Sequence, residues 1–250
     1  MSTLPYHAAI FGATSAIAIE TMRAMVRQKS AKLLLIGRDL ARLDAVASDL
    51  RSRGAECTTL SANFLDTKTD WQLLLNEHAQ SMPWDLLLIA HGSLPDQDAA
   101  FRDPQAMATT LDVNFVSPAV IATACAHILE KQNFGTLAVF GSVAGDRGRG
   151  SNFIYGSAKA GIDAFFAGMR HHFSKHPQIK IITLKPGMTD SPMTSHLPKG
   201  SLFSTAECVG ILSWQAIQSG PSVAYLPSWW KIIMALIRLL PDKLLHKTKL

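Results

Sequence analysis

The chain has 250 residues, of which 48% are hydrophobic and 17% are charged, which is enough for one α/β domain with a full core. Its net charge of +5 comes from dispersed basic residues without a nucleic-acid reading motif, so we expect no nucleic-acid partner. The cysteines Cys57, Cys125 and Cys208 are widely spaced, which is typical of a reducing compartment and predicts no metal site.

The N-terminus leaves no room for a signal peptide, because a strand-like segment starts within a few residues. No uninterrupted apolar run reaches the roughly 18 residues that a spanning helix needs. We therefore expect a cytoplasmic protein, with the inner face of the membrane as an alternative that depends on the C-terminal tail.

Short apolar runs alternate along the chain with longer segments of helical spacing. The apolar runs predict strands over Tyr6–Phe11, Leu33–Ile36, Cys57–Leu60, Asp85–Ala90, Thr136–Phe140, Lys180–Leu184 and Val223–Leu226. The longer segments predict helices over Ile17–Arg27, Leu40–Arg53, Lys68–Gln80, Gln105–Lys131 and Tyr155–Ser174. Strands that are apolar throughout are typical of a parallel sheet covered on both faces. The alternation therefore predicts a single-domain, doubly wound Rossmann-type α/β fold, a parallel sheet with helices on both faces. It would comprise residues 1–226, and an apolar, amphipathic tail at residues 227–250 would belong to the same domain.

The segment after the first predicted strand reads as a tight turn that leads into a helix. Such a turn aims backbone amides and the positive end of the helix at a pyrophosphate. We assign this role to Gly12, Thr14, Ser15, Ala16 and Ile17. The alternative is a surface turn that Thr14 or Ser15 caps.

The second predicted strand ends at Gly37 and Arg38, where a fold that prefers NAD usually carries an acidic residue. A guanidinium forms forked hydrogen bonds with a phosphate. The sequence therefore favours NADP(H) over NAD(H), and the alternative is an arginine on a solvated loop.

A third motif combines Tyr155 with Lys159, four residues later, and with Ser142, thirteen residues upstream of the tyrosine. On a helix, the four-residue spacing places Tyr155 and Lys159 on one face. We expect the ammonium to make the tyrosine hydroxyl more acidic, and the serine to hydrogen-bond the same reacting oxygen. This set suits proton transfer to an oxygen of a carbonyl group. A helix-surface pair is the alternative.

Taken together, these motifs resemble the short-chain dehydrogenase/reductase family over nearly the whole chain. Of the family's Gly-x-x-x-Gly-x-Gly pattern only Gly12 is kept, with Ala16 and Ala18 at the other glycine positions. The resemblance implies that Asn114 holds a water of the proton relay. It also implies cofactor contacts at Tyr155, Lys159, Asn63, Phe64, Ala90, His91, Gly92, Pro186, Gly187, Met188 and Thr189. The family's two asparagines are replaced by Ile89 and Ala90, and His91 is either a cofactor contact or hydrogen-bonded scaffold.

The resemblance also implies an activity, the reduction of a ketone to an alcohol by NADPH. Tyr155 would donate the proton, Ser142 would position the carbonyl oxygen, and Lys159 would lower the tyrosine pKa and bind the nicotinamide ribose. A 3-oxoacyl-type reductase and a non-catalytic NADP-binding sensor remain alternatives. Family members are commonly dimers or tetramers, so we expect a homodimer or homotetramer.

Two features bear on the substrate, which we expect to be a small-molecule or lipid-linked carbonyl compound. Arg147 and Arg149 lie between the serine and the tyrosine and could bind a phosphate, unless they belong to a solvated loop. The tryptophan-rich tail is too short to cross a bilayer but could lie in its interface, or else cover the sheet or a partner subunit. The loop and tail are similar to those of decaprenylphosphoryl-2-keto-erythro-pentose reductases, which implies a keto-sugar on a polyprenyl phosphate.

Overall fold

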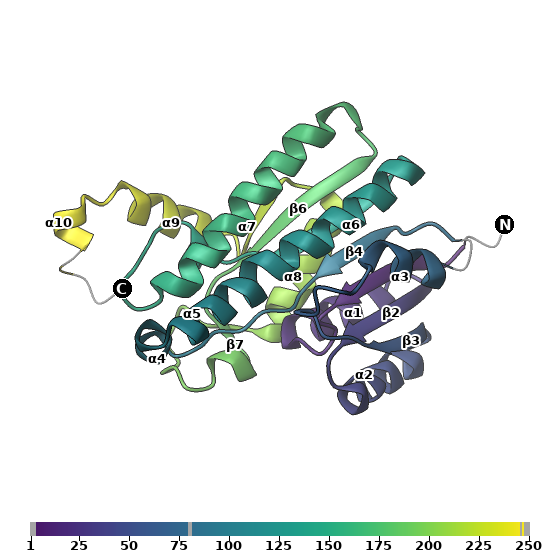
Figure 1. The fold of residues 1–250 in the computed structure, drawn as a ribbon, viewed down its shortest axis with the longest axis horizontal. Coiled ribbons are helices and arrows are strands. Elements are labelled where there is room, and N and C mark those ends of the chain that lie inside the picture. The colour runs from purple at the N-terminus through teal and green to yellow at the C-terminus, as the bar shows by residue number, and fades with distance from the viewer. Residues whose placement is uncertain (1–3, 80–81, 246, 248–250) are drawn as a thin grey trace.

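The computed structural model describes residues 4–79, 82–245 and 247. Within these residues, seven parallel strands form one sheet in the order β3-β2-β1-β4-β5-β6-β9 (Figure 1). The strands are β1 (Tyr6–Phe11), β2 (Ala31–Gly37), β3 (Glu56–Ser61), β4 (Leu86–Ile89), β5 (Gly135–Phe140), β6 (Ile179–Pro186) and β9 (Val223–Leu226). The strand order reverses between β1 and β4, which is the point where such sheets bind ligands. The predicted doubly wound fold is confirmed.

Helices cover both faces of the sheet, because successive residues of each strand point to opposite sides (Figure 1). In β1, for example, Ile10 packs on one side and Phe11 on the other. One face is covered by α1 (Ala16–Val26), α2 (Leu40–Ser52) and α8 (Ala206–Ser219). The opposite face is covered by α3 (Trp71–His78), α6 (Ser117–Gln132) and α7 (Phe153–His172).

The predicted helices are present with ends shifted by one or two residues, apart from two that differ more. The helix predicted over Lys68–Gln80 begins at Trp71, because the Asp70 carboxylate accepts the N–H of Leu73 and caps the helix there. Gln80 itself lies outside the described residues. The helix predicted over Gln105–Lys131 consists of α5 (Pro104–Leu111) and α6, joined by a π-helical turn at Asp112–Val116.

Some elements were not predicted, and α8 is the largest of them. Its packing face includes Gly210, where a Cβ atom would lie 2.3 Å from the Cβ of Glu20 in α1. A residue without a side chain is needed for this close approach, and it weakens the apolar spacing from which a helix is recognised. The other elements are short: α4 (Gln97–Arg102), β7 (Thr189–Asp190), β8 (Ser204–Thr205) and α10 (Asp242–Leu245).

The continuous helical segment Pro104–Gln132 is long and apolar enough to cross a bilayer, judged by its length and composition. In this fold its α6 part lies on the sheet, with Ile121, Cys125 and Leu129 fully buried. A core helix has the same composition, and packing on the sheet accounts for part of the apolar residues here, because Val116 and Val120 are exposed.

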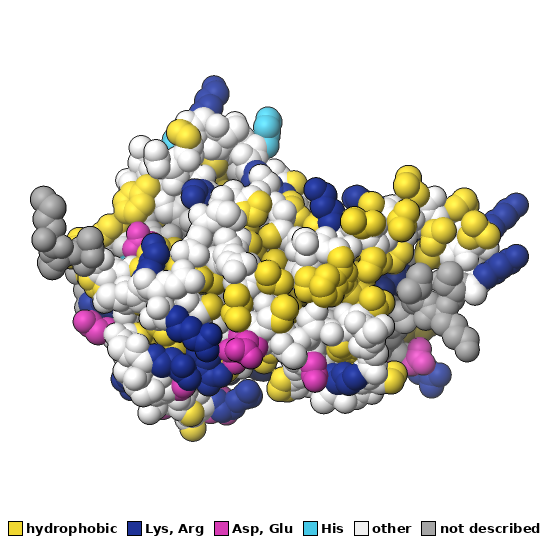
Figure 2. Space-filling view, turned by 180° about the vertical axis from the view of Figure 1, so that it is seen from behind, with side chains coloured by type: hydrophobic (Ala, Val, Ile, Leu, Met, Phe, Trp, Pro, Cys, Tyr) yellow, Lys and Arg dark blue, Asp and Glu magenta, His cyan; other side chains and the backbone are white. Residues whose placement is uncertain are grey.

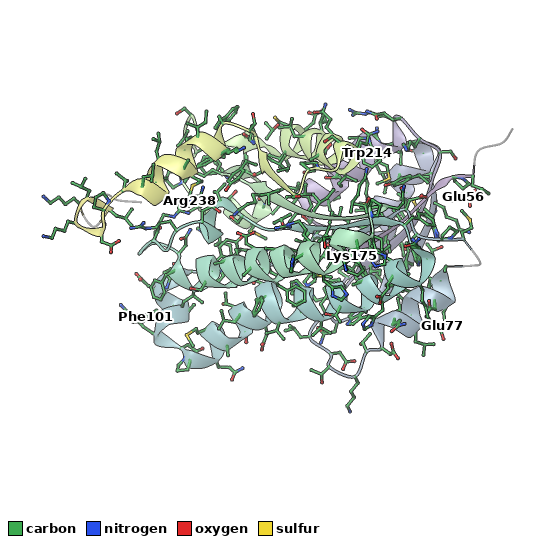
Figure 3. All side chains as sticks on the ribbon, turned by 90° about the horizontal axis from the view of Figure 1, so that it is seen from above. Glu56, Glu77, Phe101, Lys175, Trp214 and Arg238 are labelled. Atoms are coloured by element: carbon green, nitrogen blue, oxygen red, sulfur yellow. The ribbon has the colours of Figure 1, made fainter. Side chains whose placement is uncertain are left out.

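The predicted site residues lie toward one end of the molecule. Glu56, at the start of β3, marks the amino edge of the sheet (Figure 3). Phe101 of α4 and Arg238 of α9 (Trp230–Leu239) lie at the opposite end. That end, near the carboxyl edge of the strands, carries the loops with the predicted site residues.

Candidate active site

The structure brings Ser142, Tyr155 and Lys159 together at the carboxyl edge of β5. Tyr155 and Lys159 lie one turn apart on α7, as their spacing predicted, and the lysine Nζ is 5.7 Å from the centre of the tyrosine ring. Ser142 follows β5, and its side chain is close enough to the Tyr155 hydroxyl to act on the tyrosine pKa. Its own Oγ accepts the N–H of Ala144 at 3.1 Å, which fixes the serine at the start of a short 3₁₀ turn.

The acidity of Tyr155 differs from the expectation. Burial raises the pKa of its hydroxyl to about 12, and the nearby Ser142 side chain only partly offsets this effect. The expected lowering of the Tyr155 pKa by Lys159 is therefore wrong. The lysine Nζ is instead directed to the carbonyl oxygen of Phe140, to which it donates at 2.9 Å. At neutral pH Tyr155 thus keeps its proton, as a group that donates a proton must.

Lys159 is almost fully buried, and this burial lowers the pKa of its ammonium to about 8. The Asp163 carboxylate, one turn further along α7, acts in the opposite direction. The balance leaves most Lys159 side chains charged at neutral pH.

Asn114 lies in the π-helical turn, fully buried and directed toward Lys159. Its Oδ1 accepts the N–H of Ser93 at 3.1 Å, and its Nδ2 donates to the carbonyl oxygens of Ser93 and Thr110 at 2.9 and 3.0 Å. A Cβ atom on Gly92 would lie 2.8 Å from Asn114 Oδ1 and 3.7 Å from Lys159 Nζ. The three residues therefore meet at one point, and Gly92 leaves room there.

The turn at Gly12 has the geometry of a phosphate site. Gly12 adopts φ +87°, and a Cβ atom there would lie 2.5 Å from the backbone nitrogen of His91. Ser15 precedes α1 without a side-chain capping hydrogen bond, so the first amides of the helix have no such partner from it. Thr14, Ala16 and Ile17 are partly exposed beside it. A pyrophosphate fits this open helix end.

His91, one of the expected cofactor contacts, follows Ala90 just after the end of β4. Its ring stacks on Phe64 at a centroid distance of 4.3 Å, and its Nε2 is 3.0 Å from the Ser117 hydroxyl. Burial, with the charges of Lys159 and Arg38, lowers the pKa of His91 to about 3, so the ring is neutral. Its Nδ1 is buried without a hydrogen-bond partner among the described residues. A purely structural histidine would be expected to use both ring nitrogens, so this one only partly fits that alternative.

Two further residues line the same end of the sheet. Arg38 is exposed after β2, and its charge reaches His91. The Asn63 side chain closes a local turn, because its Oδ1 accepts the N–H of Leu65 at 3.1 Å.

The segment Pro186–Thr189 lies under the first helix of the tail. A Cβ atom on Gly187 would lie 1.8 Å from Nε1 of Trp230, so the indole of α9 packs directly on this glycine. Trp230 also contacts a small apolar cluster that contains Val143, the residue after Ser142. Thr189 donates to the carbonyl oxygen of Gly187 at 3.2 Å, and Met188 is exposed. Helix α9 therefore forms a wall beside the predicted site, which the sequence did not indicate.

The two arginines predicted to bind substrate differ in their surroundings. Arg147 donates to the carbonyl oxygens of Arg238 and Leu240 at 3.1 and 3.2 Å, and it pairs with Asp242 at 2.5 Å. Its guanidinium thus holds the tail, and binding a phosphate would require these contacts to break. Arg149 has a buried Nε without a hydrogen-bond partner among the described residues. Of the two, Arg149 is the better placed to receive an anion.

Comparison with known proteins connects this geometry to a family. A family model described as short chain dehydrogenase matches residues 6–201. An uncharacterized oxidoreductase of Streptomyces coelicolor is 28% identical over 240 residues, which cover 95% of this chain and 94% of the relative.

Solved structures share the fold. The bulky-bulky ketone specific alcohol dehydrogenase from Comamonas testosteroni matches with a TM-score of 0.77 at 21% identity, over 99% of this chain and 96% of that one. A 3-oxoacyl (acyl-carrier protein) reductase from Brucella melitensis, in complex with NAD, matches with a TM-score of 0.78 at 19% identity, over 92% and 99%. At these identities the likeness concerns the fold alone.

Proposed function

We propose a reaction from the premise that this chain belongs to the short chain dehydrogenase family and is an oxidoreductase with a nicotinamide dinucleotide cofactor. The proposed reaction is the reduction of a ketone to an alcohol with NADPH. The observation that carries it is the placement of Tyr155 one helical turn from Lys159 on α7, with Ser142 beside them at the carboxyl edge of β5.

Each group of the site has a role in this proposal. When bound, the reduced nicotinamide supplies a hydride for the carbonyl carbon. Tyr155 donates its proton to the carbonyl oxygen, and Ser142 stabilises the negative charge that develops there. Lys159 orients the ribose hydroxyls and favours the tyrosinate that remains after the transfer. Asn114, which meets Lys159 at Gly92, would hold the water that returns the proton.

The preference for NADPH over NADH is supported by Arg38. Its exposed guanidinium stands at the carboxyl end of β2, where an acidic residue would repel a 2′-phosphate. Its charge also acts on His91, another of the expected cofactor contacts. The open helix end at Ser15 and the stacked Phe64 and His91 rings support binding at the pyrophosphate and adenosine positions.

The proposed test is an assay of NADPH oxidation over a panel of ketones, with wild type and Tyr155→Phe. Loss of the general acid should reduce turnover by at least about 10²-fold, while NADPH binding measured by fluorescence is retained. Near-normal turnover in Tyr155→Phe would remove this residue from the proton transfer. NADPH binding without turnover of any ketone would favour the non-catalytic sensor.

For the substrate, we propose a keto-sugar carried on a polyprenyl phosphate. The partly unpaired Arg149 and the apolar wall of α9 near Val143 and Gly187 would suit a phosphate and a lipid, respectively. A 3-oxoacyl thioester is the second candidate, since one solved relative in fold bears that name. The ketone panel should contain both, and activity on β-keto thioesters alone would exclude the lipid-linked sugar.

We further propose that α9 contacts an anionic membrane surface. Its outward face carries Trp229, Ile232, Leu236 and Leu239, whose exposures lie between 47% and 80%. The exposed cations Lys231, Arg238, Lys243 and Lys247 lie on or beside it, whereas Asp242 is paired with Arg147. Figure 2 shows hydrophobic side chains together with basic ones at this end of the molecule. Such a combination favours the interface of a bilayer with acidic headgroups.

Vesicle sedimentation tests this contact without removing the buried side of α9. Leu236→Glu should reduce binding to vesicles that contain phosphatidylglycerol, and Leu73→Glu on α3, at a similarly exposed leucine, should not. Equal binding of both variants would overturn the membrane proposal. A change of oligomeric state in Leu236→Glu alone would indicate a partner subunit on this face instead.

The expected homodimer or homotetramer remains a proposal as well. Val116, at the end of the π-helical turn, and Val120, in the first turn of α6, are exposed. A Cβ atom on Gly168 of α7 would meet open space. Such a face allows a second copy to pack closely. Val120→Glu should shift the protein to a smaller species in size-exclusion chromatography with light scattering if this face is the interface.

A further inference from the structure

A cluster of buried charged groups lies directly behind the candidate active site. The ammonium of Lys185 forms ion pairs with Asp146 and, at 2.6 Å, with Asp163. The Tyr225 hydroxyl donates to the second oxygen of Asp146 at 2.7 Å. The side chains of Lys185 and Asp146 are 6% and 2% exposed, so this pair is shielded from water, and the Asp163 side chain is 22% exposed. Charges buried in this way cost free energy, and hydrophobic residues can often replace them without loss of stability.

The cluster connects the segments that carry the site. Asp146 lies in the loop after Ser142, Lys185 directly precedes Pro186, and Asp163 follows Lys159 by one turn of α7. Two glycines make room for the Asp163 carboxylate. A Cβ atom on Gly141 would lie 3.0 Å from its Oδ1, and one on Gly145 would lie 2.9 Å from its Oδ2.

The charges of the cluster complement that of Lys159. Lys185 and the two carboxylates together carry one net negative charge, and the Lys159 ammonium carries one positive charge. Among the described residues no carboxylate lies within ion-pair distance of Lys159, which donates instead to the neutral carbonyl of Phe140. The two carboxylates exceed Lys185 by one negative charge, which a charged Lys159 helps to balance.

Other titratable groups surround the two lysines, and they do not supply this negative charge. His91 at the end of β4 is neutral, and Tyr155 on α7 keeps its proton. The Arg170 guanidinium, which donates to the Thr183 hydroxyl, interacts with Asp163, and the Arg149 guanidinium interacts with Asp146. Arg238 of α9 interacts with Tyr225. Asp163 is the carboxylate one turn after Lys159 on the same face of α7, where opposite charges four residues apart attract, and it favours the charged form of Lys159.

We propose that Asp163, held in place by Lys185 and Asp146, is a positioning residue that keeps Lys159 in its charged form for cofactor binding and proton transfer. The proposal rests on the role given to Lys159 in the proposed function. One oxygen of Asp163, Oδ1, is buried without a hydrogen-bond partner among the described residues. A carboxylate with a purely structural role would be expected to accept hydrogen bonds at both oxygens. A carboxylate that acts through its negative charge does not need both hydrogen bonds.

The test measures the charge of Lys159 in variants that are matched chemically. Asp163→Asn and Asp146→Asn each remove one of the two carboxylates that pair with Lys185. Of these two carboxylates, only Asp163 raises the pKa of Lys159. The NADPH dissociation constant, measured by fluorescence over a range of pH, should rise above the Lys159 pKa of about 8 in wild type. In Asp163→Asn this rise should begin about one pH unit lower, the scale of one nearby opposite charge. Asp163→Glu should restore the wild-type profile.

Both asparagine variants are expected to lower the melting temperature, so stability alone does not decide the matter. Equal pH profiles for the two asparagine variants, or an unchanged profile in Asp163→Asn, would overturn the proposal. A ¹³C NMR titration of the Lys159 side chain in the free protein gives the same comparison without NADPH. If the lysine titration moves in Asp163→Asn while NADPH affinity does not follow it, the positioning role stands and the proposed function of Lys159 fails.

Should Asp163→Asn fail to fold, the wild-type protein supplies the measurement. The carboxyl ¹³C shift of Asp163 should change in step with the Lys159 side chain as the lysine loses its proton. A flat Asp163 signal across that range would contradict the coupling.

Discussion

Replacement of Arg147 by methionine tests whether this residue holds the tail or binds substrate. In the structure, its guanidinium donates to the carbonyl oxygens of Arg238 and Leu240 and pairs with Asp242. Each hydrogen bond to a carbonyl contributes about 1 kcal/mol. The Asp242 side chain is 76% exposed, so the ion pair adds little, at most about 1 kcal/mol. Methionine keeps most of the aliphatic stem, so Arg147→Met should weaken the docking of α9 and α10 by about 2 kcal/mol.

Hydrogen exchange with mass spectrometry reads this change directly. A loss of about 2 kcal/mol should reduce the protection of residues 230–245 by about thirtyfold, if these residues exchange by local opening. Asp242→Asn, which removes only the exposed ion pair, should change protection by less than about fivefold. Unchanged exchange in Arg147→Met would refute the docking role. If KM for the ketone then rises, Arg147 binds substrate as the sequence suggested.

Three further predictions concern the cofactor and pH. Arg38→Glu should weaken NADPH binding by about tenfold or more and spare NADH, since it replaces the phosphate partner by a repelling charge; equal loss for both nucleotides in a fluorescence titration would contradict this role. Gly12→Ala should destabilise the fold by about 1–3 kcal/mol and weaken NADPH binding, because strain at φ +87° adds to the contact with His91. Gly54→Ala is the control, because Gly54 has a similar φ of +93° but open space around it, so this variant has the strain without the contact. Equal melting temperatures of the Gly12→Ala and Gly54→Ala variants would show that the contact with His91 does not destabilise the fold. The rate of ketone reduction should fall as pH rises through about 8, because Lys159 then loses its charge, whereas Tyr155 stays protonated up to about 12. A rate that is constant up to pH 10 would contradict the prediction that Lys159 loses its proton before Tyr155.

The parts of the site that the sequence predicted depend on neighbours along the chain. The spacing of Tyr155 and Lys159 places them on one helix face whatever else packs nearby. The strand, the turn at Gly12 and the start of α1 likewise follow from consecutive residues. Alternating apolar runs were enough to predict the parallel sheet, since its strands are buried on both faces.

The acidity of the site depended on burial, which no local pattern reports. The expectation that Lys159 makes Tyr155 more acidic was wrong, because desolvation of the hydroxyl is the larger effect. Helix α8 was not predicted for a related reason. Gly210 has a low helix propensity, and it is needed there because α8 packs against Glu20, nearly two hundred residues away in the chain.

The sequence by itself thus determined the fold class, which the structure confirms, and it predicted a set of site residues whose roles stay predictions. Only the tertiary structure decided the surroundings of those residues. It directed Arg147 to the tail, set Trp230 against Gly187, and joined Asp146, Asp163 and Lys185 behind Lys159. The physical reason is that ion pairs and close contacts depend on which distant segments meet, whereas helix faces and turns depend on residues a few positions apart.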